Sequence, residues 1–233
     1  EESMKRIILI VLVSMILGHP AAYSQQKPFV FGFKAGPNLG WLRPDAKGYE
    51  RDGMRAGFSW GFVADFFLME NYSIVTGFDV VFLNGALEIP HEMPEGAIVK
   101  EGTLSRKYML KYIQLPVSLK MRTNELGKFR TFGQIGLGTN FLIAAKADDT
   151  FIPASGEPVS DEADIYSDIT FMYESLIVGA GAEYSLGGST VLKAGIVFNN
   201  GFMDILKGEN ARNPAINNKA YANYLSLDIG IVF

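Results

Sequence analysis

The 233-residue chain has no cysteine, only two histidines and no sustained apolar period of 3.6 residues from Phe29 onward. The lack of cysteine excludes a disulfide framework, a thiolate nucleophile and every cysteine-based metal site. A formal net charge of −4 at pH 7 argues against nucleic-acid binding, which normally uses a basic surface. No apolar run reaches the roughly 20 residues that a transmembrane helix needs. The fold must therefore be held by packing, or by a sheet that closes on itself.

The N-terminal segment has the three-part design of a secretory signal peptide. Met4-Lys5-Arg6 is a short basic start, and residues 7–18 are almost entirely apolar. Ala22 and Ser24 supply the small residues of a cleavage site. The alternative, a buried N-terminal helix, is less favoured because the apolar run is short and is followed by this site.

These features predict where the mature chain begins. Residues 1–3 form a short upstream extension, and the signal peptide covers 1–24. Gln25 follows the predicted cut, and the absence of a cysteine there argues against a lipid anchor. We expect one further domain, at 25–233.

The rest of the chain alternates apolar and polar residues with a period of two, which is typical of half-buried strands. The predicted strands are 29–41, 55–69, 72–87, 107–122, 129–146, 170–186, 189–203 and 222–233. Tight turns (70–71, 123–127, 187–188) alternate with long polar connections (42–54, 88–106, 147–169, 204–221). Outer-membrane barrels have short periplasmic turns and long extracellular loops. The sequence thus predicts an all-β fold, a closed antiparallel up-and-down transmembrane β-barrel of eight strands.

The distribution of charge separates this barrel from a soluble eight-stranded carrier, whose interior is apolar. Seven charged residues fall at mid-strand positions on the inward parity: Lys34, Asp65, Asp79, Lys120, Glu183, Lys193 and Asp228. A lysine facing lipid near the midplane would cost about 2–4 kcal/mol, so these side chains belong in the lumen. Unpaired buried charges are costly. We therefore expect the seven to pair and to plug the lumen.

Aromatic residues near the strand ends predict two girdles at the membrane interfaces. The expected periplasmic girdle contains Phe29, Tyr72, Phe129, Tyr184 and Phe233, and the outer one contains Trp41, Tyr108, Tyr173 and Tyr224. The chain also ends on Phe233, after a strand in which Leu225 to Ile231 alternate strictly. Such an end resembles the signal by which the barrel assembly machinery recognises its substrates.

Candidates for chemistry are few. His91 is the single histidine beyond the predicted signal peptide, and a solvated loop residue is its simplest interpretation. The acidic segment 147–169 offers weak cation candidates, Asp148, Asp149, Asp161, Glu162 and Asp164, although a solvated acidic loop is favoured. We predict no catalytic residue, no metal site and no cofactor, and hence no enzyme.

Three segments resemble the PorT-like outer-membrane β-barrel family. Gly32–Leu39 is similar to its opening strand, and Gly133–Leu142 to its glycine-rich fifth strand. Lys111–Lys120 resembles its central Tyr-x-x-x-Pro-x-x-x-Lys strand, with Gln114 where the family more often has an acid. The resemblance implies an outer-membrane location and a β-barrel architecture. The namesake of the family is linked to a secretion system.

Three functions remain open. The leading hypothesis is a structural or interaction barrel in the bacterial outer membrane, whose extracellular loops meet lipid headgroups, surface polymers or partner proteins. The second is an accessory component of a secretion or export machine. The third, a lipid-modifying enzyme, is disfavoured by the scarcity of histidine.

Overall fold

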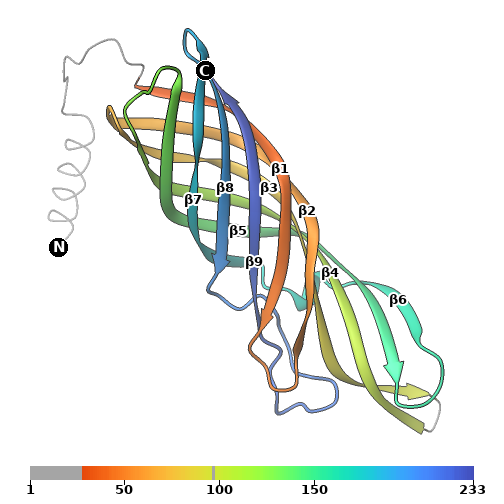
Figure 1. The fold of residues 1–233 in the computed structure, drawn as a ribbon. Coiled ribbons are helices and arrows are strands. Elements are labelled where there is room, and N and C mark those ends of the chain that lie inside the picture. The colour runs from red at the N-terminus through yellow and green to blue at the C-terminus, as the bar shows by residue number, and fades with distance from the viewer. Residues whose placement is uncertain (1–27, 96–97) are drawn as a thin grey trace, which may run out of the picture.

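The computed structural model describes residues 28–95 and 98–233. Residues 1–24, assigned above to a signal peptide, lie outside the described residues. No helix in the described part of the chain is long and apolar enough to cross a membrane. The chain forms one elongated β-structure, with short turns and Phe233 at one end and the long connections at the other (Figure 1).

Eight strands close into an antiparallel ring, as the sequence predicts. The strands are β1 Phe29–Pro44, β2 Glu50–Met69, β3 Tyr72–Glu95, β4 Ile98–Arg122, β5 Phe129–Pro153, β7 Met172–Gly187, β8 Thr190–Gly201 and β9 Ala220–Val232. Consecutive members of the ring pair with each other, and pairing between β1 and β9 closes it. The main-chain N–H of Phe233 donates to the carbonyl of Phe31, 2.9 Å away, at the seam. The wall of the barrel is therefore continuous.

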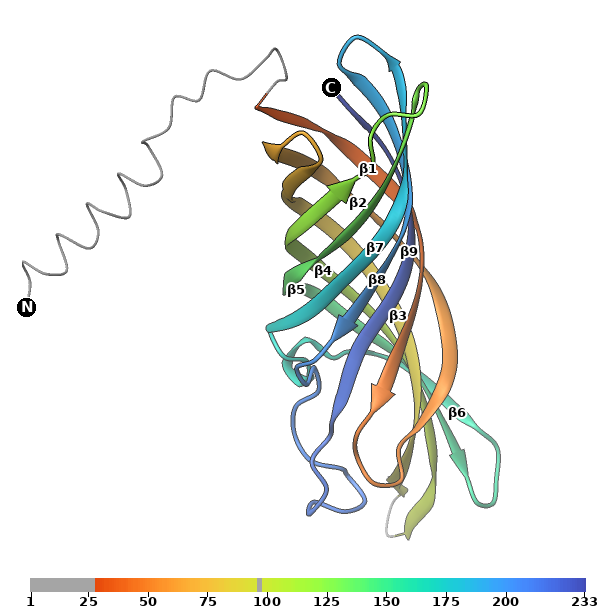
Figure 2. The same cartoon turned by 60° about the vertical axis from the view of Figure 1, so that its left-hand side comes forward.

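The expected loops at 88–106 and 147–169 are largely strands. The hairpin of β3 and β4 keeps its register out to Glu95↔Ile98, and β5 runs on to Pro153. A ninth strand, β6 (Val159–Asp164), pairs with β5 outside the ring, and a short 3-10 helix η1 (Tyr166–Asp168) follows it. Figure 2 shows these strands extending past the beginning of β9. Loops were expected at 88–106 and 147–169 because of their polarity, but polar residues are compatible with strands that pair in water.

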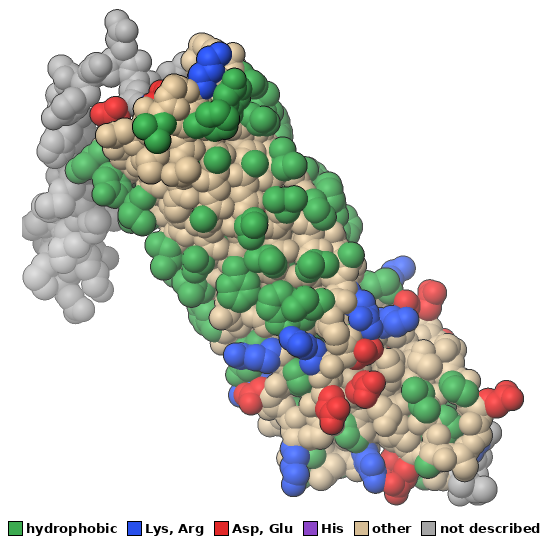
Figure 3. Space-filling model, in the orientation of Figure 1, with side chains coloured by type: hydrophobic (Ala, Val, Ile, Leu, Met, Phe, Trp, Pro, Cys, Tyr) green, Lys and Arg blue, Asp and Glu red, His purple; other side chains and the backbone are tan. Residues whose placement is uncertain are grey.

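The outer wall of the ring is apolar. Side chains such as Phe33, Trp60 and Ile135 are exposed, while their chain neighbours Gly32, Ser59 and Lys34 are buried or half-buried. Figure 3 shows apolar side chains over the visible face of the wall, with charged side chains concentrated toward the long-connection end. A barrel whose outward-facing side chains are apolar suits a lipid environment.

The interior changes character along the barrel axis. Toward the short turns it is charged, and toward the long connections it holds a large apolar core. Leu42, Leu83, Leu110 and Leu142 are among the fully buried members of this core. The part of the barrel beyond the lipid-facing band, formed by residues 42–54, 86–95, 98–106, 145–169 and 203–222, is called the cap below.

The expected outer girdle was partly wrong. Tyr108, Tyr173 and Tyr224 belong to the buried interior core. Even-numbered residues of β4 face inward, so the parity that places Gln114 inside places Tyr108 there too. Of the expected set only Trp41 lies on the outer wall, stacked on Phe198 at 5.9 Å between ring centroids. Phe58, Phe82, Phe171 and Phe202 are exposed aromatic side chains toward this end of the wall.

Candidate functional site: the lumen and the cap

The seven charged residues assigned to the lumen all face the interior, in two clusters. The first cluster joins three strands, because Lys34 Nζ on β1 lies 2.8 Å from Asp79 Oδ2 on β3 and 3.1 Å from Asp228 Oδ2 on β9. The Asp79 side chain is 5 % exposed and that of Lys34 is 25 % exposed, so the acid is the better shielded member of the pair. The first cluster holds one cation between two acids.

The second cluster lies nearer the short turns. Lys120 Nζ on β4 contacts the carboxylate of Asp65 on β2 and lies 2.7 Å from Glu183 Oε1 on β7. Lys193 on β8 approaches Asp65 Oδ2 to 3.3 Å. Lys120 is fully buried, so Asp65 and Glu183, rather than water, balance its charge. Of the four strands in this cluster only β7 and β8 are neighbours, so the cluster links separate parts of the ring.

Arg122 belongs to the second cluster, and the sequence reasoning missed it. Its Nη1 lies 3.5 Å from Glu183 Oε2, and its guanidinium carbon lies 4.3 Å from the centre of the Phe67 ring. Arg122 lies two residues beyond Lys120 on β4, so it shares the inward face. Strand parity was the signal that could have identified it.

A layer of amides crosses the lumen between the charges and the apolar core. Gln114 Nε2 donates to Asn140 Oδ1 (2.9 Å) and to Asn199 Oδ1 (3.0 Å). Its Oε1 accepts a hydrogen bond from Tyr224 Oη at 3.1 Å. An acid at position 114 could not donate to both amide oxygens, which explains in physical terms why glutamine suits this barrel.

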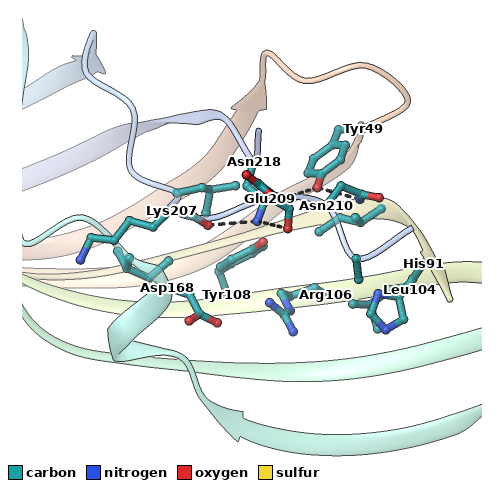
Figure 4. A pocket seen from close by; sticks show the side chains of 14 residues that line it. Tyr49, His91, Leu104, Arg106, Tyr108, Asp168, Lys207, Glu209, Asn210 and Asn218 are labelled. Atoms are coloured by element: carbon teal, nitrogen blue, oxygen red, sulfur yellow. Dashed lines mark hydrogen bonds between the residues drawn. The ribbon is translucent and has the colours of Figure 1, made fainter. Parts of the chain in front are cut away.

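The cap contains a cavity of about 220 Å³. It lies between β4, the β1–β2 connection and the β8–β9 connection (Figure 4). One wall is a hydrogen-bonded group, in which Asn210 Nδ2 donates to Tyr49 Oη (2.9 Å) and to the carbonyl of Pro90 (3.0 Å). Arg106 lines the opposite side, held by two hydrogen bonds of 2.7 and 2.6 Å to Asp149.

His91 lines this cavity and is half-buried, which differs from the solvated loop residue that we expected. Its ring packs edge-on against Phe151 with centroids 5.8 Å apart. Burial and the nearby Arg106 guanidinium lower the pKa of His91 below its ordinary value. The described residues lining the cavity include no serine, threonine or cysteine. A base without an adjacent nucleophile does not form a hydrolytic site of the serine or cysteine type.

The five candidate cation ligands are divided by the pleat of the β5–β6 hairpin. Asp149 pairs across the hairpin with Asp161, while Asp148 pairs with Glu162 on the opposite face. Asp164 shares the face of Glu162, and Asp149 is already bound to Arg106. In the parts of the chain that the structure describes, no three acidic or histidine side chains are grouped as metal ligands.

The closed ring, the apolar wall and the charged interior define a transmembrane β-barrel. The model of the outer membrane protein beta-barrel domain family matches residues 23–207, and the chain belongs to this family. It is thus an outer-membrane barrel of bacterial type. No curated protein matches the sequence.

Solved structures with a similar fold are outer-membrane barrels. Neisserial surface protein A (NspA) aligns with a TM-score of 0.50 at 11% identity, over 90% of this chain and 98% of that one. OprG of Pseudomonas aeruginosa aligns at 0.47 and 11%, over 89% and 97% of the two chains. Ail, the attachment invasion locus protein of Yersinia pestis, aligns at 0.42 and 15%, over 89% and 100%. At these identities the likeness shows the fold alone.

Proposed function

We propose that this barrel does not conduct and that it acts as an interaction protein through its extracellular cap. The observation that carries the proposal is the filled interior, in which Lys120, the Gln114 layer and the apolar core lie one above another. An eight-stranded barrel is just wide enough for side chains to fill it. What remains for contact with other molecules is the ordered cap beyond the lipid-facing wall.

Planar-bilayer recording tests the first half of this proposal. Purified protein should give no steady single-channel steps, because the inner layers hold fully buried side chains such as Lys120, Leu83 and Leu142. Steady conductance of the wild-type barrel, absent from a preparation denatured before reconstitution, would overturn it.

Site-specific photo-cross-linking in the native membrane tests the second half. The cross-linker is placed at Val99 or Ile152 in the cap, both of which are exposed, and at Leu126 in a short turn. Adducts from the cap positions that are lacking at Leu126 would support an extracellular interaction role. Adducts confined to Leu126 would instead favour the alternative below.

The alternative is an accessory component of a secretion machine that acts from the periplasmic side. It is favoured by the resemblance of Lys111–Lys120 to the PorT-like family, an assignment that we also propose. A third role, a lipid-modifying enzyme centred on His91, has no serine, threonine or cysteine in the described lining to support it. An altered membrane lipid profile in a His91→Ala strain, with barrel levels unchanged, would bring that role back.

Export and assembly belong to the same proposal. We propose that residues 1–24 are removed, so that N-terminal sequencing of the membrane form should begin at Gln25. Phe233 packs edge-on against Phe31 at 4.9 Å between centroids, and its ring is exposed to lipid. We expect Phe233→Ala to slow assembly by the barrel machinery in vivo while leaving refolding of the purified chain in detergent nearly unchanged.

A further inference from the structure

The cap contains a sheet with two edges. Beyond the ring, β3, β4, β5 and β6 continue as four paired antiparallel strands. In the lipid-facing region the closed ring leaves no edge, but here the sheet ends on β3 at one side and on β6 at the other. A free edge presents unpaired main-chain N–H and C=O groups that can pair with another strand.

The β3 edge is protected. The register of β2 with β3 ends at Glu50↔Glu88, and the next part of β3 contains Pro90 and Pro94, which have no N–H to donate. The β8–β9 connection also covers this edge, since Asn210 donates to the carbonyl of Pro90 at 3.0 Å. Addition of a strand at this edge is therefore disfavoured.

The β6 edge is open. Among the described residues, β6 pairs with β5 alone, and both ribbon views show β6 at the margin of the cap (Figures 1 and 2). The N–H of Ile165 donates to the carbonyl of Ala145, so odd-numbered residues of this segment face β5. The main-chain groups of Ser160, Glu162 and Asp164 consequently point away from the sheet.

The side chains at this edge do not block it. Residues 159–162 are all exposed, and no proline lies within β6. The outward N–H of Glu162 donates a hydrogen bond of 2.9 Å to the carboxylate of the preceding residue, Asp161. This bond is local and exposed, and an incoming carbonyl could replace it.

The charge of the edge indicates what can pair with it. Asp161, Glu162 and Asp164 lie on β6, and residues 147–169 contain no lysine or arginine. A second copy of this chain would place acids directly opposite acids, which destabilises a strand pair. A strand carrying lysine or arginine would form favourable cross-strand pairs instead.

We infer that the free edge of β6 is a docking site for an extended, lysine- or arginine-rich segment of a partner protein, which adds to the cap sheet as its next strand. The main-chain hydrogen bonds supply affinity, and the acids of β6 select the charge of the partner. This inference rests on the proposed interaction role and specifies its surface and the chemistry of its partner.

Binding of a model strand to the full barrel in detergent micelles provides the test. The probe is a fluorescein-labelled peptide of alternating lysine and threonine, and the readout is fluorescence anisotropy. A control peptide with the same number of lysines, each followed by two prolines, has the same charge but lacks two thirds of the main-chain N–H donors along each of its edges. The threonine peptide should bind and the proline peptide should not.

Three variants separate the edge from the charge. Glu162→Pro removes an outward N–H without touching the ladder to β5, and it should weaken binding about tenfold, through loss of a hydrogen bond, a charge and local fit. Glu162→Gln removes the charge alone and should weaken binding about twofold. Glu157→Gln makes the same charge change in the exposed connection before β6 and should have little effect. Circular dichroism and heat modifiability, the difference in gel mobility between unheated and boiled samples, check that each variant is folded.

Several results would overturn the inference. These are the absence of peptide binding, equal binding to wild type and Glu162→Pro, equal binding of the two peptides, or a dimer of the barrel that Glu162→Pro dissolves. Photo-cross-linking in cells distinguishes this failure from failure of the proposed function. Adducts at Val99 without adducts at Ser160 would reject only the β6 edge as the docking site. Adducts at neither position would reject both the docking site and the proposed interaction role.

Discussion

Removal of the buried Lys120 ammonium is the sharpest test of the lumen. Lys120→Met keeps most of the side-chain volume but leaves Asp65 and Glu183, which are 2 % and 5 % exposed, without their shared cation. Breaking a buried ion pair by removing one partner typically costs about 3–5 kcal/mol. Lys193 and Arg122 still approach the two acids, so we expect the lower end, about 3 kcal/mol.

Equilibrium unfolding in urea, with the barrel folded in lipid vesicles, measures this cost. Trp41 and Trp60 report the transition by fluorescence, and linear extrapolation gives the free energy of unfolding. Lys128→Met, at an exposed turn position, is the matched control and should change stability by less than about 0.5 kcal/mol. A loss below about 1 kcal/mol for Lys120→Met would refute the claim that the cluster is tightly coupled.

Three further predictions concern the other layers. Tyr112 Oη is buried without a hydrogen-bond partner among the described residues, whereas Tyr224 Oη donates to the amide layer. Tyr112→Phe should therefore leave the urea midpoint unchanged or raised, and Tyr224→Phe should cost about 1–3 kcal/mol; equal effects would contradict this assignment. Ile135→Arg, in the middle of the exposed wall of β5, should cost about 2–4 kcal/mol in vesicle unfolding, and a neutral result would place that wall away from lipid. The lowered pKa of His91 means that the unfolded chain binds more protons, so its contribution to cap stability is present above the unfolded pKa of about 6.5 and is lost as the pH falls through the folded value. An NMR titration of the His91 ring should show a midpoint below that value, and a midpoint at or above it would be inconsistent with burial beside Arg106.

The face of each strand in the membrane-spanning region was predictable because a strand has a period of two. Phe33 and Lys34, or Trp60 and Ser59, must lie on opposite faces wherever the strand is regular. The same rule was sufficient for Tyr108 and Tyr173, which were placed in a girdle only because aromatic side chains are common there. In β5 the rule itself changes, since a bulge near Ile143 shifts the register and turns odd-numbered residues such as Phe151 inward. A bulge leaves no clear mark in a single sequence.

The long connections were harder to predict, for a different reason. Segments 88–106 and 147–169 are polar enough to be loops, yet each forms strands by pairing with a neighbour. Each segment is a hairpin whose strands are close in the chain, with Glu95 opposite Ile98 and Phe151 opposite Val159, and polarity alone does not distinguish such a hairpin from a loop. The cavity beside His91 also needs Tyr49 and Asn210, which are distant from it in the chain, so it could not be inferred from local residues.

The sequence by itself determined that the chain closes into an eight-stranded barrel with charges inside and apolar side chains outside. It could do so because alternation, turn spacing and the cost of a charge in lipid are local properties of the chain. Only the tertiary structure decided which charges meet. Lys120, Asp65 and Glu183 come from strands that are not adjacent, and the tilt and stagger of the closed ring bring them together. The same closure explains why the open edge lies in the cap, where β6 leaves the ring and nothing in the described chain pairs with its outer side.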